Sequence, residues 1–183
     1  MKATGIVRRI DDLGRVVIPK EIRRTMRIRE GDPLEIYTDR EGEVIFKKYS
    51  PIGELSGFAA EYAETLYKTC NMAVVICDRD SVIACAGVSR KEYTDKRISD
   101  ELAEIIEKRS LFVHKDTGEK LPAIADGTSH YISCAMPIIS EGDIAGCVAS
   151  LAESDGKSKE LGGDIETKLV MTAATFLGKQ IES

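Results

Sequence analysis

The sequence has no tryptophan and few other aromatic residues, with six tyrosines and four phenylalanines among 183 residues. Any packed core must therefore be mainly aliphatic, and the apolar share of 43% is large enough to form one. Long apolar runs are also missing. The longest, MAVVIC at residues 72–77, is far too short to cross a bilayer, so we expect no membrane-spanning helix. No signal peptide is visible at the start, and we expect a cytoplasmic protein.

Groupings typical of catalytic or metal sites are also scarce. The two histidines, His114 and His130, do not lie in a zinc-binding HExxH pattern, and no serine lies in a GxSxG context. The five cysteines form no CxxC pair, and most lie in apolar runs, where cysteine packs as a small hydrophobe. We therefore predict a protein without enzymatic activity, metal or cofactor. The cysteines are Cys70, Cys77, Cys85, Cys134 and Cys147.

Positive charge is concentrated in the first 29 residues, although the whole chain carries a net charge of -5. This segment has nine basic and three acidic residues, a net charge of +6, so the remainder sums to -11. Glu21 could pair with Arg24, and Asp11 or Asp12 with Arg8 or Arg9, yet three acids cannot neutralise nine cations. A basic segment of this kind favours contact with phosphate groups. Its basic residues are Lys2, Arg8, Arg9, Arg15, Lys20, Arg23, Arg24, Arg27 and Arg29.

The first fifty residues predict a small β-rich unit. Strands are expected at 4–10 and 15–18, a short helix at 19–26, and a hairpin of strands 33–39 and 43–49 turned at Gly42. A unit of this size buries too little apolar surface to be stable alone without disulfides, metal or a partner chain. Because it contains no cysteine and no metal-ligand cluster, we expect it to fold as an interlocked dimer.

The rest of the chain predicts an α+β domain. Its expected order is helix, strand, strand, helix, strand, strand, helix, with a central antiparallel sheet flanked by the first and last helices. The apolar stripe from Leu55 to Leu66 can pack within its own domain, between chains, or both. We expect three parts: a basic, candidate DNA-binding domain at 1–50, a linker helix at 51–70, and an α+β domain at 71–183. The expected strands lie at 72–78, 81–87, 130–139 and 144–152, and the later helices at 99–109 and 164–182.

Residues 4–49 closely resemble the AbrB-type DNA-binding domain, and more distantly MazE-type antitoxins. The stretch GRVVIPKEIRR at 14–24 is highly specific. The full-length pattern resembles sporulation transcription regulators in which a GAF-like domain follows such a head. This resemblance implies an α+β protein with an N-terminal swapped-hairpin β-barrel formed by two chains and a C-terminal GAF-like antiparallel sheet flanked by helices. It further implies a nucleoid-associated regulator that activates and represses sporulation genes.

The resemblance places DNA-contacting arginines on the first strand, after the turn and on the short helix. The matching positions are Arg8, Arg15, Arg23 and Arg24, and Arg9 and Lys2 are weaker candidates. Because asparagine and glutamine are absent from the first fifty residues, we expect recognition through the DNA backbone and DNA shape. The implied partners are double-stranded DNA, a homodimer through residues 1–50, and a homotetramer through helices 54–69 and 165–182.

Other interpretations remain open. A MazE-like antitoxin would use the same head and a tail that masks a toxin, and such tails are usually short and poorly folded. A few GAF relatives are enzymes that use cysteines to reduce methionine sulfoxide, an interpretation that the cysteine spacing does not favour. The GAF-like domain itself is either a regulatory small-molecule pocket or a purely structural relic.

Overall fold

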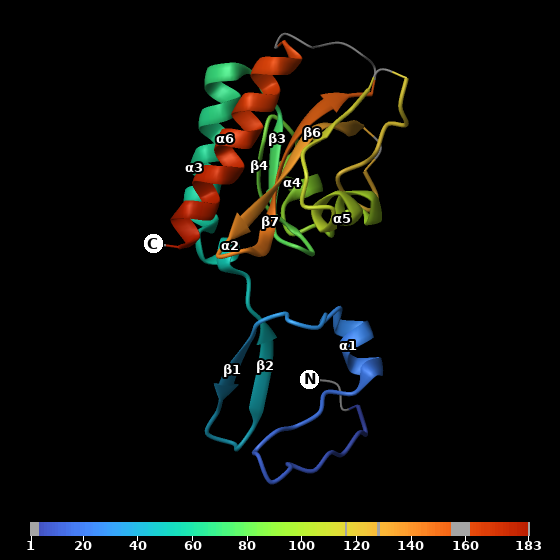
Figure 1. Cartoon of the computed structure of the whole chain (residues 1–183), viewed down its shortest axis with the longest axis vertical. Helices are drawn as coiled ribbons and strands as arrows, with labels where there is room; N and C mark the ends of the chain where they lie inside the picture. The colour runs from blue at the N-terminus through green and yellow to red at the C-terminus, as the bar shows by residue number, and fades with distance from the viewer. Residues whose placement is uncertain (1–3, 116, 128, 155–161, 183) are drawn as a thin grey trace. The chain divides into compact units, whose positions relative to one another are not determined.

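The computed structural model describes residues 4–115, 117–127, 129–154 and 162–182. The chain divides into two compact units, residues 1–49 and residues 50–183 (Figure 1). Among the described residues, no helix is both long and apolar enough to traverse a lipid bilayer.

The first unit contains the predicted short helix and hairpin. Helix α1 spans Lys20–Met26. Strands β1 (Leu34–Thr38) and β2 (Val44–Lys48) pair antiparallel, with Ile36 opposite Phe46. Their connection uses Gly42 at a φ of 85°, a conformation that glycine adopts without steric cost. The helix and the hairpin are therefore confirmed.

The two strands predicted before α1 are not formed within one chain. Residues 4–10 and 15–18 form no strand and belong to no sheet among the described residues. A turn lies between them, in which the Asp11 N–H donates to the Arg15 carbonyl at 3.0 Å. The strand prediction is wrong for a single chain, because a strand needs a neighbour whose N–H and C=O groups complete the ladder.

The first unit also leaves its apolar side chains in contact with solvent. Among the described residues 4–49, no Val, Ile, Leu, Met, Phe or Tyr is buried, and Val7 is 85% exposed. One chain therefore does not close a hydrophobic core in this unit. Its large exposed apolar residues are Ile6, Val7, Ile10, Leu13, Val16, Val17, Met26, Ile36, Tyr37, Val44, Phe46 and Tyr49.

The second unit is a five-stranded antiparallel sheet between helices (Figure 1). The strand order is β4-β3-β7-β6-β5. The predicted strands and closing helix are confirmed, and the predicted linker helix is divided at Leu55 into α2 and α3. The strands are β3 (Val74–Cys77), β4 (Val82–Ala86), β5 (Phe112–Val113), β6 (His130–Ser140) and β7 (Asp143–Glu153). The helices are α2 (Pro51–Glu54), α3 (Ser56–Cys70), α4 (Arg90–Tyr93), α5 (Asp100–Glu107) and α6 (Gly163–Ile181).

Each face of the sheet has its own core. Val74 and Ile76 of β3 pack in the cluster that includes residues of α3 and α6, whereas Val75 and Cys77 pack in the cluster that includes α5. This division follows from the alternation of side chains along a strand. Four of the five cysteines are buried, as predicted, and burial raises the pKa of the Cys134 thiol to about 11.

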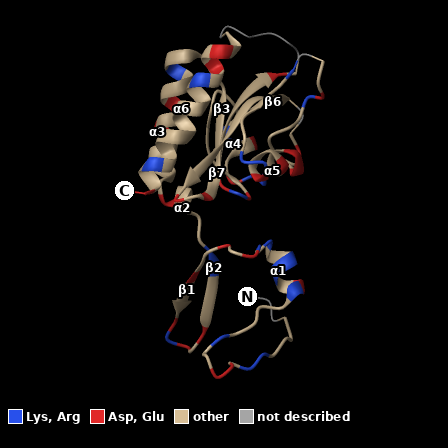
Figure 2. Ribbon diagram, in the orientation of Figure 1, with Lys and Arg blue, Asp and Glu red and all other residues tan. Residues whose placement is uncertain are grey.

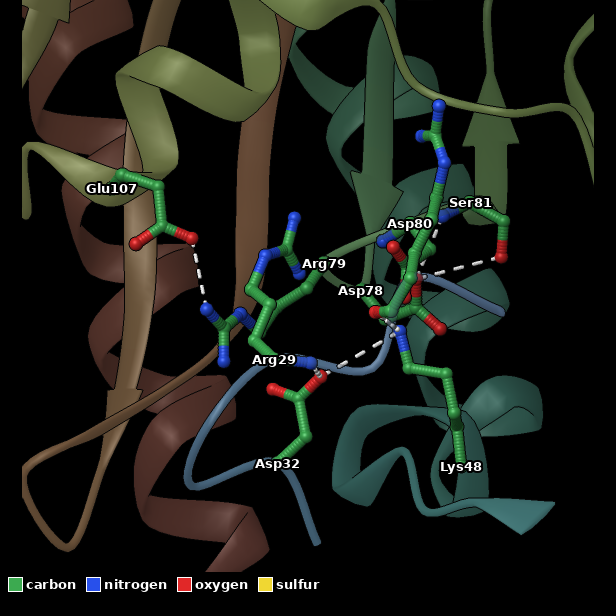
Figure 3. A network of polar contacts seen from close by, with 9 residues as sticks. Arg29, Asp32, Lys48, Asp78, Arg79, Asp80, Ser81 and Glu107 are labelled. Carbon is green, nitrogen blue, oxygen red and sulfur yellow. Dashed lines mark hydrogen bonds and ion pairs between the residues drawn. The ribbon is translucent and has the colours of Figure 1, made fainter. Parts of the chain in front are cut away.

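A polar turn joins β3 to β4. One oxygen of Asp78 accepts hydrogen bonds from the backbone N–H groups of Asp80 and Ser81, each at 2.7 Å (Figure 3). From the same turn, Nη2 of Arg79 donates to the Glu107 carboxylate at 2.8 Å. The turn is thereby fixed to the end of α5.

Candidate nucleic-acid interface

Helix α1 presents two of the predicted DNA-contacting residues. Pro19 precedes the helix with a φ of -57°, a value that its ring fixes and that suits the start of a helix. Arg23 and Arg24 lie in the last turn, where the negative end of the helix dipole favours cations. Both residues are exposed, and the ribbon of α1 carries blue Lys and Arg segments in Figure 2.

The end of α1 is sharply defined. Arg27 adopts a left-handed conformation with a φ of 53°. The Ile28 N–H donates to the Arg23 carbonyl at 2.8 Å, and the Arg27 N–H donates to the Arg24 carbonyl at 3.3 Å. These bonds satisfy carbonyls that a helix end leaves free, so the backbone that carries the two arginines is held in one geometry.

The segment before the turn presents Arg8 and Arg9, and both residues are exposed. Lys2, the remaining candidate, lies outside the described residues. Among the described candidates, neither Arg8 nor Arg9 forms an ion pair, although Nη1 of Arg8 donates to the neighbouring Val7 carbonyl at 3.3 Å. Their guanidinium groups therefore keep donors for an external acceptor.

Arg15 is held differently. Its Nε donates to Oδ2 of Asp11 at 2.8 Å, and its backbone N–H donates to Oδ1 of the same carboxylate at 2.7 Å. The sequence left Asp11 or Asp12 as possible partners of Arg8 or Arg9, whereas in the structure Asp11 pairs with Arg15. The turn brings residue 15, rather than residue 8 or 9, over the carboxylate. Nearness along the chain gave no signal for this choice.

The arrangement suits an anionic partner. Five described arginines, at positions 8, 9, 15, 23 and 24, are exposed on one small unit, three on the N-terminal segment and two on α1. Guanidinium groups bind phosphate and guanine edges through paired N–H donors. Within the described ranges, no three His, Cys, Asp or Glu side chains gather as metal ligands would.

Two family profiles match the chain. The profile described as "Stage V sporulation protein T C-terminal, transcription factor" matches residues 54–182. The profile described as "Antidote-toxin recognition MazE, bacterial antitoxin" matches residues 7–53. The two matches correspond closely to the two units of the structure.

Whole proteins and solved structures extend these matches. Stage V sporulation protein T of Bacillus subtilis (strain 168) is 51% identical over 184 residues, covering 100% of this chain and 99% of that protein. Transition state regulatory protein AbrB of the same organism is 65% identical over 51 residues, 28% of this chain and 52% of that protein. The GAF domain of nlh2 from A. aeolicus has a TM-score of 0.52 at 14% identity, covering 70% of this chain and 85% of that one. The last similarity shows the fold alone.

Proposed function

Because the chain belongs to the stage V sporulation protein T family of transcription factors, we propose that it regulates sporulation genes by binding double-stranded DNA. Its first unit binds the DNA, and the protein acts on the nucleoid in the cytoplasm, as an activator at some genes and a repressor at others. The observation that carries this proposal is the set of exposed arginines on a unit that is 65% identical to part of AbrB. The DNA-binding domain comprises residues 1–50.

Four arginines make the principal DNA contacts: Arg8, Arg15, Arg23 and Arg24. Arg9 and Lys2 add weaker ones. Phosphate contacts position a protein on the duplex, whereas sequence is read from base edges or DNA shape. Since the first fifty residues contain no asparagine or glutamine, the protein selects its sites mainly through the backbone and the shape of the duplex.

The DNA-binding unit is a homodimer. Twelve large apolar side chains of residues 4–49 are exposed in one chain, and the two segments predicted as strands, 4–10 and 15–18, lack a strand neighbour. A second copy provides both the missing strands and the missing core, which produces the swapped-hairpin barrel. Pairing also doubles the set of arginines, and a duplex with two-fold symmetry accepts two equal basic surfaces.

The second unit joins dimers into a homotetramer through residues 54–69 and 165–182. Aromatic rings from α3 and α6 gather on the outer face of these helices: the ring centroid of Phe176 lies 5.8 Å from that of Phe58 and 5.7 Å from that of Tyr62. Phe176 remains 40% exposed. A patch of this kind on a helix pair favours packing against a second copy.

Two other questions concern the antitoxin interpretation of the whole chain and the role of the second unit. The antitoxin interpretation is less supported, because the MazE profile covers residues 7–53 while the transcription-factor profile covers residues 54–182. The GAF-like fold of the second unit supports either ligand sensing or a structural role. A thermal-shift screen of small molecules on the full chain separates these two, and a ligand regulates DNA binding only if it prefers one state of the protein.

The proposal is tested by removing arginines one at a time. Arg23→Ala should weaken binding to a promoter duplex about tenfold or more, uniformly across sequences if the contact is to phosphate. The plot of log affinity against log salt should flatten by about 0.9 for each phosphate that the protein no longer neutralises, and about twice that in a dimer. Fluorescence anisotropy over a salt series measures both quantities.

The matched control is Lys91→Ala, which removes an exposed cation from the acidic second unit. It should leave the affinity and the salt slope unchanged. If the folded Arg23→Ala protein binds as tightly and with the same slope as the parent, the assignment of this residue to the interface is wrong.

A further inference from the structure

We propose that Asp11 is a positioning residue for DNA binding, which fixes the guanidinium group of Arg15 so that its two Nη groups are presented to the duplex. This inference rests on the proposed function, since it concerns an arginine assigned there to DNA. It gives a role in binding to an acidic residue, whose charge by itself would repel DNA.

The geometry of the turn carries the inference. Oδ1 of Asp11 accepts hydrogen bonds from the backbone N–H groups of Leu13 at 3.1 Å and Arg15 at 2.7 Å. The Asp11 N–H donates to the Arg15 carbonyl, and the Gly14 N–H donates to the Asp11 carbonyl, each at 3.0 Å. Oδ1 of Asp11 thus closes the turn, and Oδ2 of the same carboxylate is left to bind the Arg15 side chain.

The second oxygen holds one edge of the guanidinium group. Oδ2 of Asp11 accepts from Nε of Arg15 at 2.8 Å. A guanidinium group has five N–H donors, so this bond leaves the four on the Nη atoms for a ligand. The Arg15 side chain is 69% exposed and that of Asp11 is 36% exposed. The group is therefore restrained at its base and accessible at its tip.

Restraint of this kind increases affinity. A free arginine side chain loses rotamer entropy when binding fixes it, and a side chain that is already fixed loses less. An exposed ion pair contributes little to the stability of the fold, so stability does not account for the arrangement. Hydrogen bonds from the backbone and then the side chain of Arg15 lower the pKa of Asp11 below its usual value, so this contact favours the charged carboxylate.

A substitution that removes the charge of Asp11 distinguishes a positioning role from simple repulsion of DNA, because the two predict opposite changes in DNA affinity. In the Asp11→Asn variant, the amide oxygen of the new side chain can still accept the two backbone hydrogen bonds of the turn. The substitution removes the negative charge that holds Arg15. If the charge only repels DNA, its removal tightens binding. If it positions Arg15, its removal weakens binding.

The experiment is a double-mutant cycle on the full-length protein with a promoter duplex, measured by fluorescence anisotropy. Asp11→Asn should weaken binding about threefold to tenfold when Arg15 is present. On the Arg15→Ala background the same substitution should leave binding unchanged or tighten it. Asp12→Asn is the matched control, because it removes an equal charge from the neighbouring exposed residue and should not weaken binding.

The outcomes distinguish the inference from the function on which it rests. If Arg15→Ala weakens binding while Asp11→Asn leaves it unchanged or tightens it, the positioning role is overturned and the DNA-binding assignment stands. If Arg15→Ala itself has no effect, the positioning role and the assignment of Arg15 to the interface are both overturned, whereas the proposed DNA-binding function is overturned only if the parent protein does not bind the promoter duplex.

Far-UV circular dichroism checks that each variant folds. If Asp11→Asn does not fold, Arg15→Lys takes its place, since it keeps the backbone hydrogen bonds and the positive charge but lacks the Nε donor. It should weaken binding nearly as much as Arg15→Ala, and full affinity in this variant overturns the inference.

Discussion

At the scale of single residues, Gly146 in β7 lies against the backbone of β3. A Cβ atom at this position would be 2.0 Å from the Cys77 carbonyl oxygen, a distance that requires the backbone to move. Gly146→Ala should therefore separate two strands at the centre of the sheet and lower the free energy of unfolding by at least about 2 kcal/mol. Urea denaturation of the full chain measures this change.

The matched control is Gly57→Ala. Gly57 lies in α3, and a Cβ atom added there meets no other atom within 4 Å. Since alanine favours helix over glycine by about 1 kcal/mol, this variant should be as stable as the parent or slightly more so. An equal drop in stability in both variants would contradict the role given to the close approach.

At the scale of elements, the start of α5 depends on the Ser99 hydroxyl. The hydroxyl oxygen accepts from the Leu102 N–H at 3.0 Å, and the hydroxyl O–H donates to the Pro122 carbonyl oxygen at 2.6 Å. Ser99→Ala removes both bonds in a buried place, so unfolding should become easier by about 1–2 kcal/mol. Ser89→Ala is the control, because Ser89 also precedes a helix but makes no side-chain cap, and its effect should stay within about 0.5 kcal/mol. Thermal denaturation measures the stability of both variants relative to the parent.

At the scale of the whole molecule, the proposed tetramer links two DNA-binding dimers. Phe176→Asp places a charge in the aromatic patch of α3 and α6, and it should convert tetramers into dimers by multi-angle light scattering. Because two linked dimers can bind the same long duplex together, their affinity for long DNA should exceed that of a single dimer by on the order of a hundredfold or more. The variant should therefore lose affinity for long DNA far more than for a duplex that fits one dimer.

Val113→Asp provides the control for that experiment. Val113 is 44% exposed, close to the 40% of Phe176, but lies in β5 rather than on the helix pair. It should leave both the mass and the affinity for long DNA unchanged. A parent protein that is already a dimer in solution would contradict the tetramer.

The sequence predicted whatever depended on local signals. Pro19 marked the start of α1, alternating apolar and polar residues marked the hairpin, and apolar runs marked the strands of the second unit. Helix α4 and strand β5 were not predicted, because they have only four and two residues and depend on tertiary packing, such as the burial of Tyr93. The exposed arginines were predicted from charge and resemblance, but the pairing of Asp11 with Arg15 depends on how the turn closes. No periodicity indicates that choice.

The exposed apolar surface of the first unit has a consequence for how the amount of folded DNA-binding unit depends on protein concentration. If residues 4–49 complete their core only with a second copy, folding of the DNA-binding unit is a second-order reaction, and no folded monomer is available as a reserve. In a cell that makes few chains, most DNA-binding units are then monomeric and unfolded, and proteases degrade unfolded chains most readily. Output would rise more steeply than protein level, so a modest change in synthesis would act as a developmental threshold.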